Sequence, residues 1–150
     1  MQQKKLLVLA AGILQVPVIK KAKDMGIYVI AADGDPDAVG LKYADKAIVV
    51  NITSEEDVLK VAREEKIDGV IHPCSEVSMN VMGRLNDELS LSGITREQAI
   101  RATNKHLMRE SFESGNAPSP KSILTENMED AWMHLQNDFS TDGILKPSRN

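Results

Sequence analysis

Short aliphatic runs alternate with longer segments of helical periodicity from the start of the chain. The runs cover residues 5–10, 27–32, 46–50 and 69–72, and two of the three segments between them carry apolar residues at intervals of three and four. This alternation is typical of βαβ units, in which parallel strands form one sheet and helices cover its faces. We therefore predict an α/β fold with an open, parallel, Rossmann-like sheet domain over residues 1–93.

Local signals mark where the helices of this domain begin and end. Pro17 is tolerated in the first turn of the helix that follows the first strand, and Gly26 ends that helix. Ser54 precedes three acidic residues and is the predicted N-cap of the next helix, because negative charge there suits the helix dipole. The helix after the fourth strand is predicted from apolar residues four apart, which are Val77, Val81, Leu85 and Leu89.

The pattern changes after Gly93. Thr95 and Gln98 form a capping-box pattern that predicts a short helix, and residues 104–114 predict another. We interpret residues 94–120 as a helical linker that ends in a proline-stiffened connector. Residues 121–150 are predicted to hold strands at 122–125 and 144–146, with a helix over 128–139 between them.

Composition excludes several classes of partner. The net charge is −4, and no basic face of the kind that follows a nucleic-acid backbone is evident. Cys74 is the one cysteine, so an internal disulfide and a multi-cysteine zinc site are both excluded. The apolar stretch at residues 6–11 is far shorter than the roughly 20 residues that span a bilayer. We expect a cytoplasmic protein that binds neither nucleic acid nor membrane.

Three loops follow the predicted strands at the edge where open α/β sheets bind their ligands. They comprise residues 11–12, 33–37 and 73–76. Gly12 allows close approach of the backbone to a ligand and leaves N–H groups of the next turn for an anion. A tight turn without a ligand is the alternative. Glu76 suits a polar or cationic substrate group, although the helix dipole by itself also favours a carboxylate at that position.

Two other sites are weaker hypotheses. Asp33 lies about 20 residues beyond Gly12, as a ribose-binding acid of a dinucleotide site would, but Ala10 and Gln15 occupy the positions of the first and third glycines of that fingerprint. His72 and Cys74 share a strand end and are a candidate base and thiol nucleophile. No third orienting group is evident for them, so ordinary packing is favoured.

Several segments, taken in order, resemble one known family. They are residues 7–19 (LVLAAGILQVPVI), 33–38 (DGDPDA), 43–45 (YAD), 67–70 (IDGV), 102–109 (ATNKHLMR), the Pro118-x-Pro120 connector and 144–147 (ILKP). Together they resemble the amino-terminal part of ATP-grasp ligases, in the branch with carbamoyl-phosphate synthase large subunit, biotin carboxylase and purine-biosynthetic enzymes. The resemblance implies that residues 1–93 form the domain preceding the ATP-grasp domain and that residues 121–150 begin the ATP-grasp lid, which is incomplete here.

The resemblance also implies a function for the full-length protein. Lys105 and Lys146 would contact the phosphates of ATP, while Gly12 and Glu76 are tentative substrate-binding residues. ATP and Mg would serve to activate a small-molecule carboxylate as an acyl phosphate, which an amine or similar nucleophile then displaces. The family's glycine-rich phosphate loop and metal ligands come after Lys146, so residues 1–150 are expected to hold no catalytic residue and no metal site, and to be inactive alone.

Alternatives to the ligase are a non-catalytic nucleotide- or ligand-binding α/β module and, less favoured, an NAD-binding domain. A homodimer formed through the unpaired strand edges of residues 121–150 is a further hypothesis.

Overall fold

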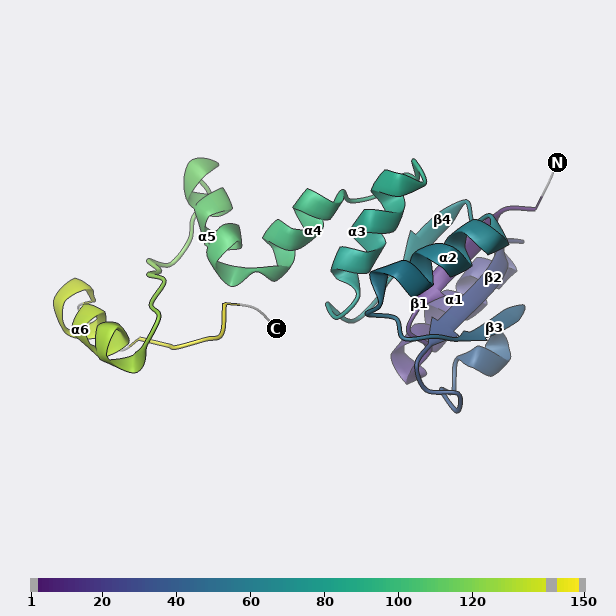
Figure 1. Ribbon diagram of the computed structural model, residues 1–150, viewed down its shortest axis with the longest axis horizontal. Coiled ribbons are helices and arrows are strands. Elements are labelled where there is room, and N and C mark those ends of the chain that lie inside the picture. The colour runs from purple at the N-terminus through teal and green to yellow at the C-terminus, as the bar shows by residue number, and fades with distance from the viewer. Residues whose placement is uncertain (1–2, 140–142, 149–150) are drawn as a thin grey trace. The chain divides into compact units, whose positions relative to one another are not determined.

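The computed structural model describes residues 3–139 and 143–148, and Figure 1 labels their helices and strands. Contacts divide the chain into two compact units, residues 1–99 and residues 100–150. The first unit holds the sheet domain and the first half of α4. Its elements are β1 (Lys5–Leu9), η1 (Ile13–Gln15), α1 (Val16–Asp24), β2 (Tyr28–Asp33), η2 (Leu41–Tyr43), β3 (Lys46–Val49), α2 (Glu55–Glu65), β4 (Gly69–Ile71), α3 (Met79–Glu88) and α4 (Arg96–Thr103).

The four strands form one parallel sheet in the order β3-β2-β1-β4. Leu6 of β1 is in register with Val29 of β2 on one side and with Gly69 of β4 on the other. β1 is therefore central, and its residues Leu7, Val8 and Leu9 have no exposed surface. A continuous apolar run is what a parallel strand covered on both faces requires. The α/β prediction and all four predicted strands are confirmed.

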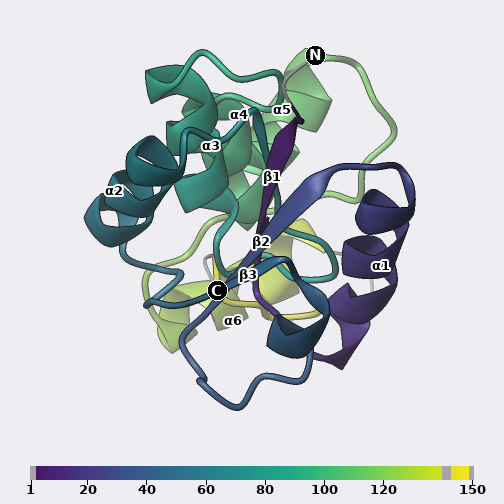
Figure 2. The ribbon, with the colours of Figure 1, turned by 90° about the vertical axis from the view of Figure 1, so that its right-hand side faces the viewer.

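Helices cover the two faces of the sheet, with α1 on one side and α2 and α3 on the other (Figure 2). Successive side chains of a strand point to opposite faces, so Leu7 packs in the apolar cluster with α2 and α3 while Val8 packs with α1. Val81 and Leu85 are buried as predicted. Val77 is a correction, because it precedes α3 and is 59% exposed.

The predicted caps of α2 and α4 are present. The Ser54 hydroxyl accepts a hydrogen bond from the Asp57 N–H, 3.5 Å away. Thr95 and Gln98 bond reciprocally: the Thr95 N–H donates to Gln98 Oε1 at 2.9 Å, and the Gln98 N–H donates to Thr95 Oγ1 at 3.1 Å. These bonds satisfy N–H groups that the first helical turn leaves without partners.

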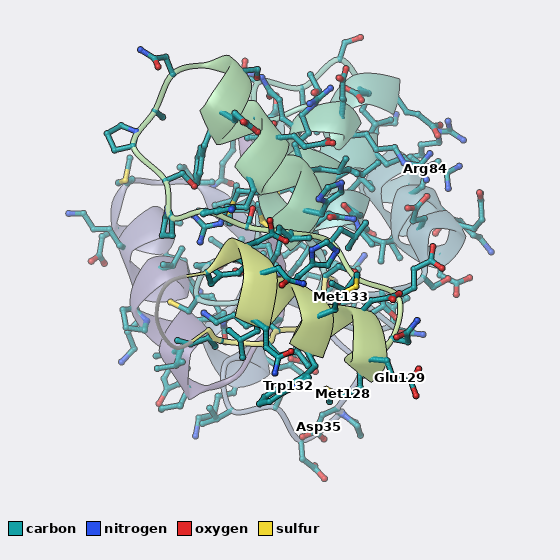
Figure 3. All side chains as sticks on the ribbon, turned by 90° about the vertical axis from the view of Figure 1, so that its left-hand side faces the viewer. Asp35, Arg84, Met128, Glu129, Trp132 and Met133 are labelled. Atoms are coloured by element: carbon teal, nitrogen blue, oxygen red, sulfur yellow. The ribbon has the colours of Figure 1, made fainter. Side chains whose placement is uncertain are left out.

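Arg84 of α3 connects charged side chains of the sheet domain and is labelled in Figure 3. Its guanidinium lies 2.7 Å from Glu88, 2.7 Å from Glu56 and 3.0 Å from Glu55. Glu55 also pairs with Arg96 of α4 at 2.9 Å. The hydrogen bonds to Glu88, then to Glu56, raise the pKa of Arg84 above its ordinary value. Helices α2, α3 and α4 are therefore connected through charged side chains.

The second unit contains the end of α4, α5 (Lys105–Ser114) and α6 (Met128–Asp138). Neither α5 nor α6 buries a residue among those described. Met128 is 69% exposed and Trp132 is 61% exposed, and both are labelled on α6 in Figure 3.

The strands predicted at residues 122–125 and 144–146 are not formed, which corrects that part of the sequence analysis. Both segments are irregular, and Leu124 and Ile144 are 54% and 84% exposed. A strand needs a hydrogen-bonded neighbour and an apolar face to bury, and two isolated short segments are marginal in water. The described part of this unit offers neither. The division of the chain at residues 93 and 120 stays a prediction.

Within the part of the chain that the structure describes, no helix is long and apolar enough to cross a membrane.

Candidate functional site

The turn after β1 is held by hydrogen bonds within the protein. Ala10 adopts a left-handed conformation with φ of 68°, and Gly12 is extended with φ of −69°. The Ala11 N–H donates to the Asp33 carboxylate at 2.6 Å, and the Ala11 carbonyl accepts from the Gly40 N–H at 2.6 Å. Glycine is therefore not required at position 12 by its φ, and the next element is the short 3-10 turn η1 rather than a long helix.

The Asp33 carboxylate is engaged by backbone of this turn and of its own loop. Its Oδ2 accepts from Ala11 and its Oδ1 accepts from the Asp35 N–H at 2.9 Å. Both oxygens of this carboxylate are therefore engaged by backbone N–H groups of the protein. A Cβ added at Gly12 would lie 3.2 Å from the Gln15 side-chain oxygen, which occupies the space near the turn. Both observations weaken the dinucleotide alternative.

His72 is a structural residue. Its Nε2 accepts from the Ser78 N–H at 3.2 Å, so its Nδ1 carries the proton and donates to the Leu9 carbonyl at 3.0 Å. The ring is 5% exposed, and both nitrogens are engaged with backbone. The hypothesis that His72 acts as a base for the Cys74 thiol is therefore wrong. His72 instead connects the end of β1, the end of β4 and the start of α3.

Glu76 lies in the exposed loop between β4 and α3. The Gln15 side-chain amide donates to the Pro73 carbonyl at 2.7 Å, which joins this loop to the turn at Gly12. The structure thus brings the Gly12 turn and the loop of Glu76 together at the carboxyl edge of neighbouring parallel strands. That edge is where open α/β sheets bind ligands.

Lys105 and Lys146 belong to the second unit. Lys105 is the first residue of α5, whose N-cap Asn104 accepts from the N–H groups of His106 and Leu107 at 3.0 and 3.1 Å. The Lys105 N–H donates to the Ser148 carbonyl at 2.8 Å. Since Ser148 is two residues after the exposed Lys146, the segments that carry the two lysines meet at the start of α5.

Sequence reasoning missed two residues of the sheet edge. Gly40 was not singled out, yet a Cβ there would lie 2.5 Å from the Ala11 carbonyl oxygen. In the sequence Gln15 is visible only as a mismatch to a glycine fingerprint, although its amide joins two loops. The role of a glutamine at the end of an apolar 3-10 turn can be recognised only when its neighbours in the tertiary structure are known.

No group of three or more His, Cys, Asp or Glu side chains that could hold a metal ion occurs among residues 3–139 and 143–148.

The parallel sheet with helices on both faces defines an α/β protein. No model of a known protein family matches the chain. It is 35% identical over 99 residues to a formate-dependent phosphoribosylglycinamide formyltransferase from Synechococcus sp., a match that covers 66% of this chain and 24% of that protein. It is 26% identical to biotin carboxylase 1 of Bacillus subtilis, covering 95% of this chain and 35% of that protein.

Solved structures agree with these relatives. Phosphoribosylglycinamide synthetase from Anaerococcus prevotii superimposes with a TM-score of 0.77 at 28% identity, covering 91% of this chain and 35% of that one. N5-carboxyaminoimidazole ribonucleotide synthetase from Thermotoga maritima has a TM-score of 0.72 at 20% identity, covering 89% of this chain and 36% of that one, and this likeness supports the fold. These proteins are ATP-grasp enzymes, and the chain is a relative of that family, which confirms the resemblance inferred from its motifs. The chain spans about a quarter of the length of the first curated relative.

Proposed function

We propose that this chain is the amino-terminal part of an ATP-dependent ligase that activates a small-molecule carboxylate as an acyl phosphate and joins it to an amine or similar nucleophile. The observation that carries the proposal is the meeting of the Lys105 and Lys146 segments through the 2.8 Å bond from the Lys105 N–H to the Ser148 carbonyl. Two lysines on neighbouring segments suit the phosphates of a nucleotide, because each supplies a compact positive charge. A cytoplasmic location remains a prediction.

In this proposal the two units have different tasks. The sheet domain contributes Gly12 and Glu76 to substrate binding, and the second unit contributes Lys105 and Lys146 to ATP. Phosphoryl transfer depends mainly on positioning and charge stabilisation, which accounts for paired lysines and for Mg as the expected cofactor. Residues that come after this segment in ATP-grasp relatives would supply the rest of the nucleotide site.

Substitution of Lys146 tests the proposal in a protein that carries this chain together with the remainder of an ATP-grasp domain. Lys146→Ala removes a charge-assisted hydrogen bond, and we expect ATP use to fall at least about tenfold. Lys60→Ala, which removes an exposed lysine of α2, is the matched control and should leave turnover unchanged. Mg-dependent ATP turnover is the measurement, and the 150-residue chain alone should show none.

Equal ATP dependence in wild type and Lys146→Ala would place Lys146 on the surface and contradict its role. Tight ATP binding without turnover by the protein that also carries the remainder of an ATP-grasp domain would favour the non-catalytic module.

A further inference from the structure

Gln15 is a buried polar residue at the carboxyl edge of the parallel sheet, and the function proposed above assigns no role to its side chain. It ends η1 and is 5% exposed. Its backbone N–H donates to the Gly12 carbonyl at 3.2 Å, and its amide nitrogen donates to the Pro73 carbonyl at 2.7 Å. A carbonyl oxygen accepts and never donates, so the orientation of the Gln15 amide is set by this contact.

The loop that accepts this bond contains a residue in an unfavourable backbone conformation. Cys74 follows Pro73 directly and has φ of 64°, a left-handed conformation that is unfavourable for a residue with a side chain. Such a conformation persists when the surroundings over-determine it. His72 holds both ends of the loop by its bond to the Ser78 N–H, and Gln15 holds the loop next to Cys74.

We propose that Gln15 is a positioning residue that holds the loop of residues 73–78, and with it Glu76, against the turn at Gly12. The inference rests on the proposed function, in which Gly12 and Glu76 both contribute to substrate binding. Glycine, which a dinucleotide-binding turn has at this position, lacks the side chain needed to reach Pro73. The chain thus uses a side-chain amide to join two loops at the position where that fingerprint uses a glycine for close packing of the helix on the strand.

Two variants distinguish the effect of the Gln15 amide donor from the effect of the size and shape of the Gln15 side chain. Gln15→Leu keeps the approximate volume and removes the amide, and Gln15→Glu keeps the shape but, at neutral pH, replaces the donor with an acceptor. Each variant loses one hydrogen bond, so we expect amide hydrogen exchange at residues 77–79 to accelerate about fivefold. Amides of β1 and β2 should keep their wild-type exchange rates. Gln3→Leu is the matched control, because the Gln3 amide also donates to a backbone carbonyl, that of Gly26 at 3.0 Å.

Wild-type exchange at residues 77–79 in Gln15→Glu, or equal acceleration throughout the sheet domain, would overturn the proposal. In the complete ligase, both Gln15 variants should raise the KM of the ligated substrates about fivefold and leave the KM for ATP and kcat unchanged. An equal change in both KM values would show a purely structural role and also overturn it. The exchange experiment needs neither ATP nor substrate, so the loop contact and the ligase function are tested separately.

Discussion

At the residue scale, the edge of the sheet depends on backbone groups that lie unusually close together. Gly40 donates its N–H to the Ala11 carbonyl at 2.6 Å, and an added Cβ would meet that oxygen at 2.5 Å. The obstacle is backbone rather than a flexible side chain, so it cannot move aside without disturbing the turn after β1. Gly40 is therefore required by close approach and not by an unusual φ.

We predict that Gly40→Ala lowers the free energy of unfolding by about 1–3 kcal/mol, because overpacking against a fixed neighbour forces the turn to shift. Gly34→Ala is the matched control, since its Cβ would lie 3.8 Å from the nearest atom, the Val50 carbonyl oxygen. That control should change stability by no more than about 0.5 kcal/mol. Urea unfolding followed by circular dichroism measures both, and equal stability of Gly40→Ala and wild type would contradict the assignment.

Asp45 provides a pH-dependent prediction. Hydrogen bonding from Lys23 and then from the Val29 N–H lowers the pKa of Asp45 below its ordinary value. A carboxylate whose pKa is lower in the folded chain stabilises fully above its unfolded pKa of about 3.9 and loses that contribution as pH falls through the folded value. Asp45→Asn should cost about 0.2–1 kcal/mol at neutral pH, because the ion pair is partly exposed.

The difference in unfolding free energy between wild type and Asp45→Asn should stay constant above about pH 5 and shrink below about pH 4. Denaturant titrations of both proteins from about pH 7 down to about pH 3 measure it. A difference that grows on acidification would have the wrong sign and reject the interpretation.

At the scale of elements, the helices of the two units are stabilised differently. α2 and α3 bury apolar side chains against the sheet, as Val58 and Leu85 show with no exposed surface. α5 buries none of its residues, so its stability depends more on its cap. Asn104 supplies that cap by accepting from the N–H groups of His106 and Leu107.

Asn104→Ala should therefore cost about 1 kcal/mol of α5 stability. We expect amide exchange within α5 to accelerate about fivefold while α2 and α3 are unaffected. Asn137→Ala, in the last turn of α6, serves as the comparison because it removes no N-cap. Unchanged exchange in α5 would show that packing, and not the cap, maintains the helix.

At the scale of the whole molecule, the two units should differ in resistance to local opening. Exchange of amides at residues 6–9 requires the central strand to separate from two neighbours and two apolar clusters. The segments 122–125 and 144–146 have no strand pairing and are largely exposed. We predict protection on the order of a thousandfold greater in 6–9 than in these segments. Native-state hydrogen exchange at low protein concentration decides this, and comparable protection would mean that residues 121–150 pack more firmly than their exposure indicates.

Local pattern by itself determined the four strands, the helices that connect and follow them, and the caps of α2 and α4. It did not predict the 3-10 turns η1 and η2 or the start of α3 at Met79. Apolar periodicity and cap residues act within a few positions of the chain, so Ser54 and Thr95 are recognisable without a structure. The motifs also indicated the ATP-grasp relationship, because their order along the chain can be seen in the sequence alone.

Tertiary structure alone decided what depends on neighbours distant in sequence. It showed that the Gln15 amide donates to the Pro73 carbonyl and that Gly40 approaches the Ala11 carbonyl closely. It also showed that both ring nitrogens of His72 form hydrogen bonds with backbone groups. It also decided that residues 122–125 and 144–146 are not strands, since a strand exists through its pairing partner and not through its own composition. Side-chain reach and strand pairing are properties of positions in space, which local propensity does not encode.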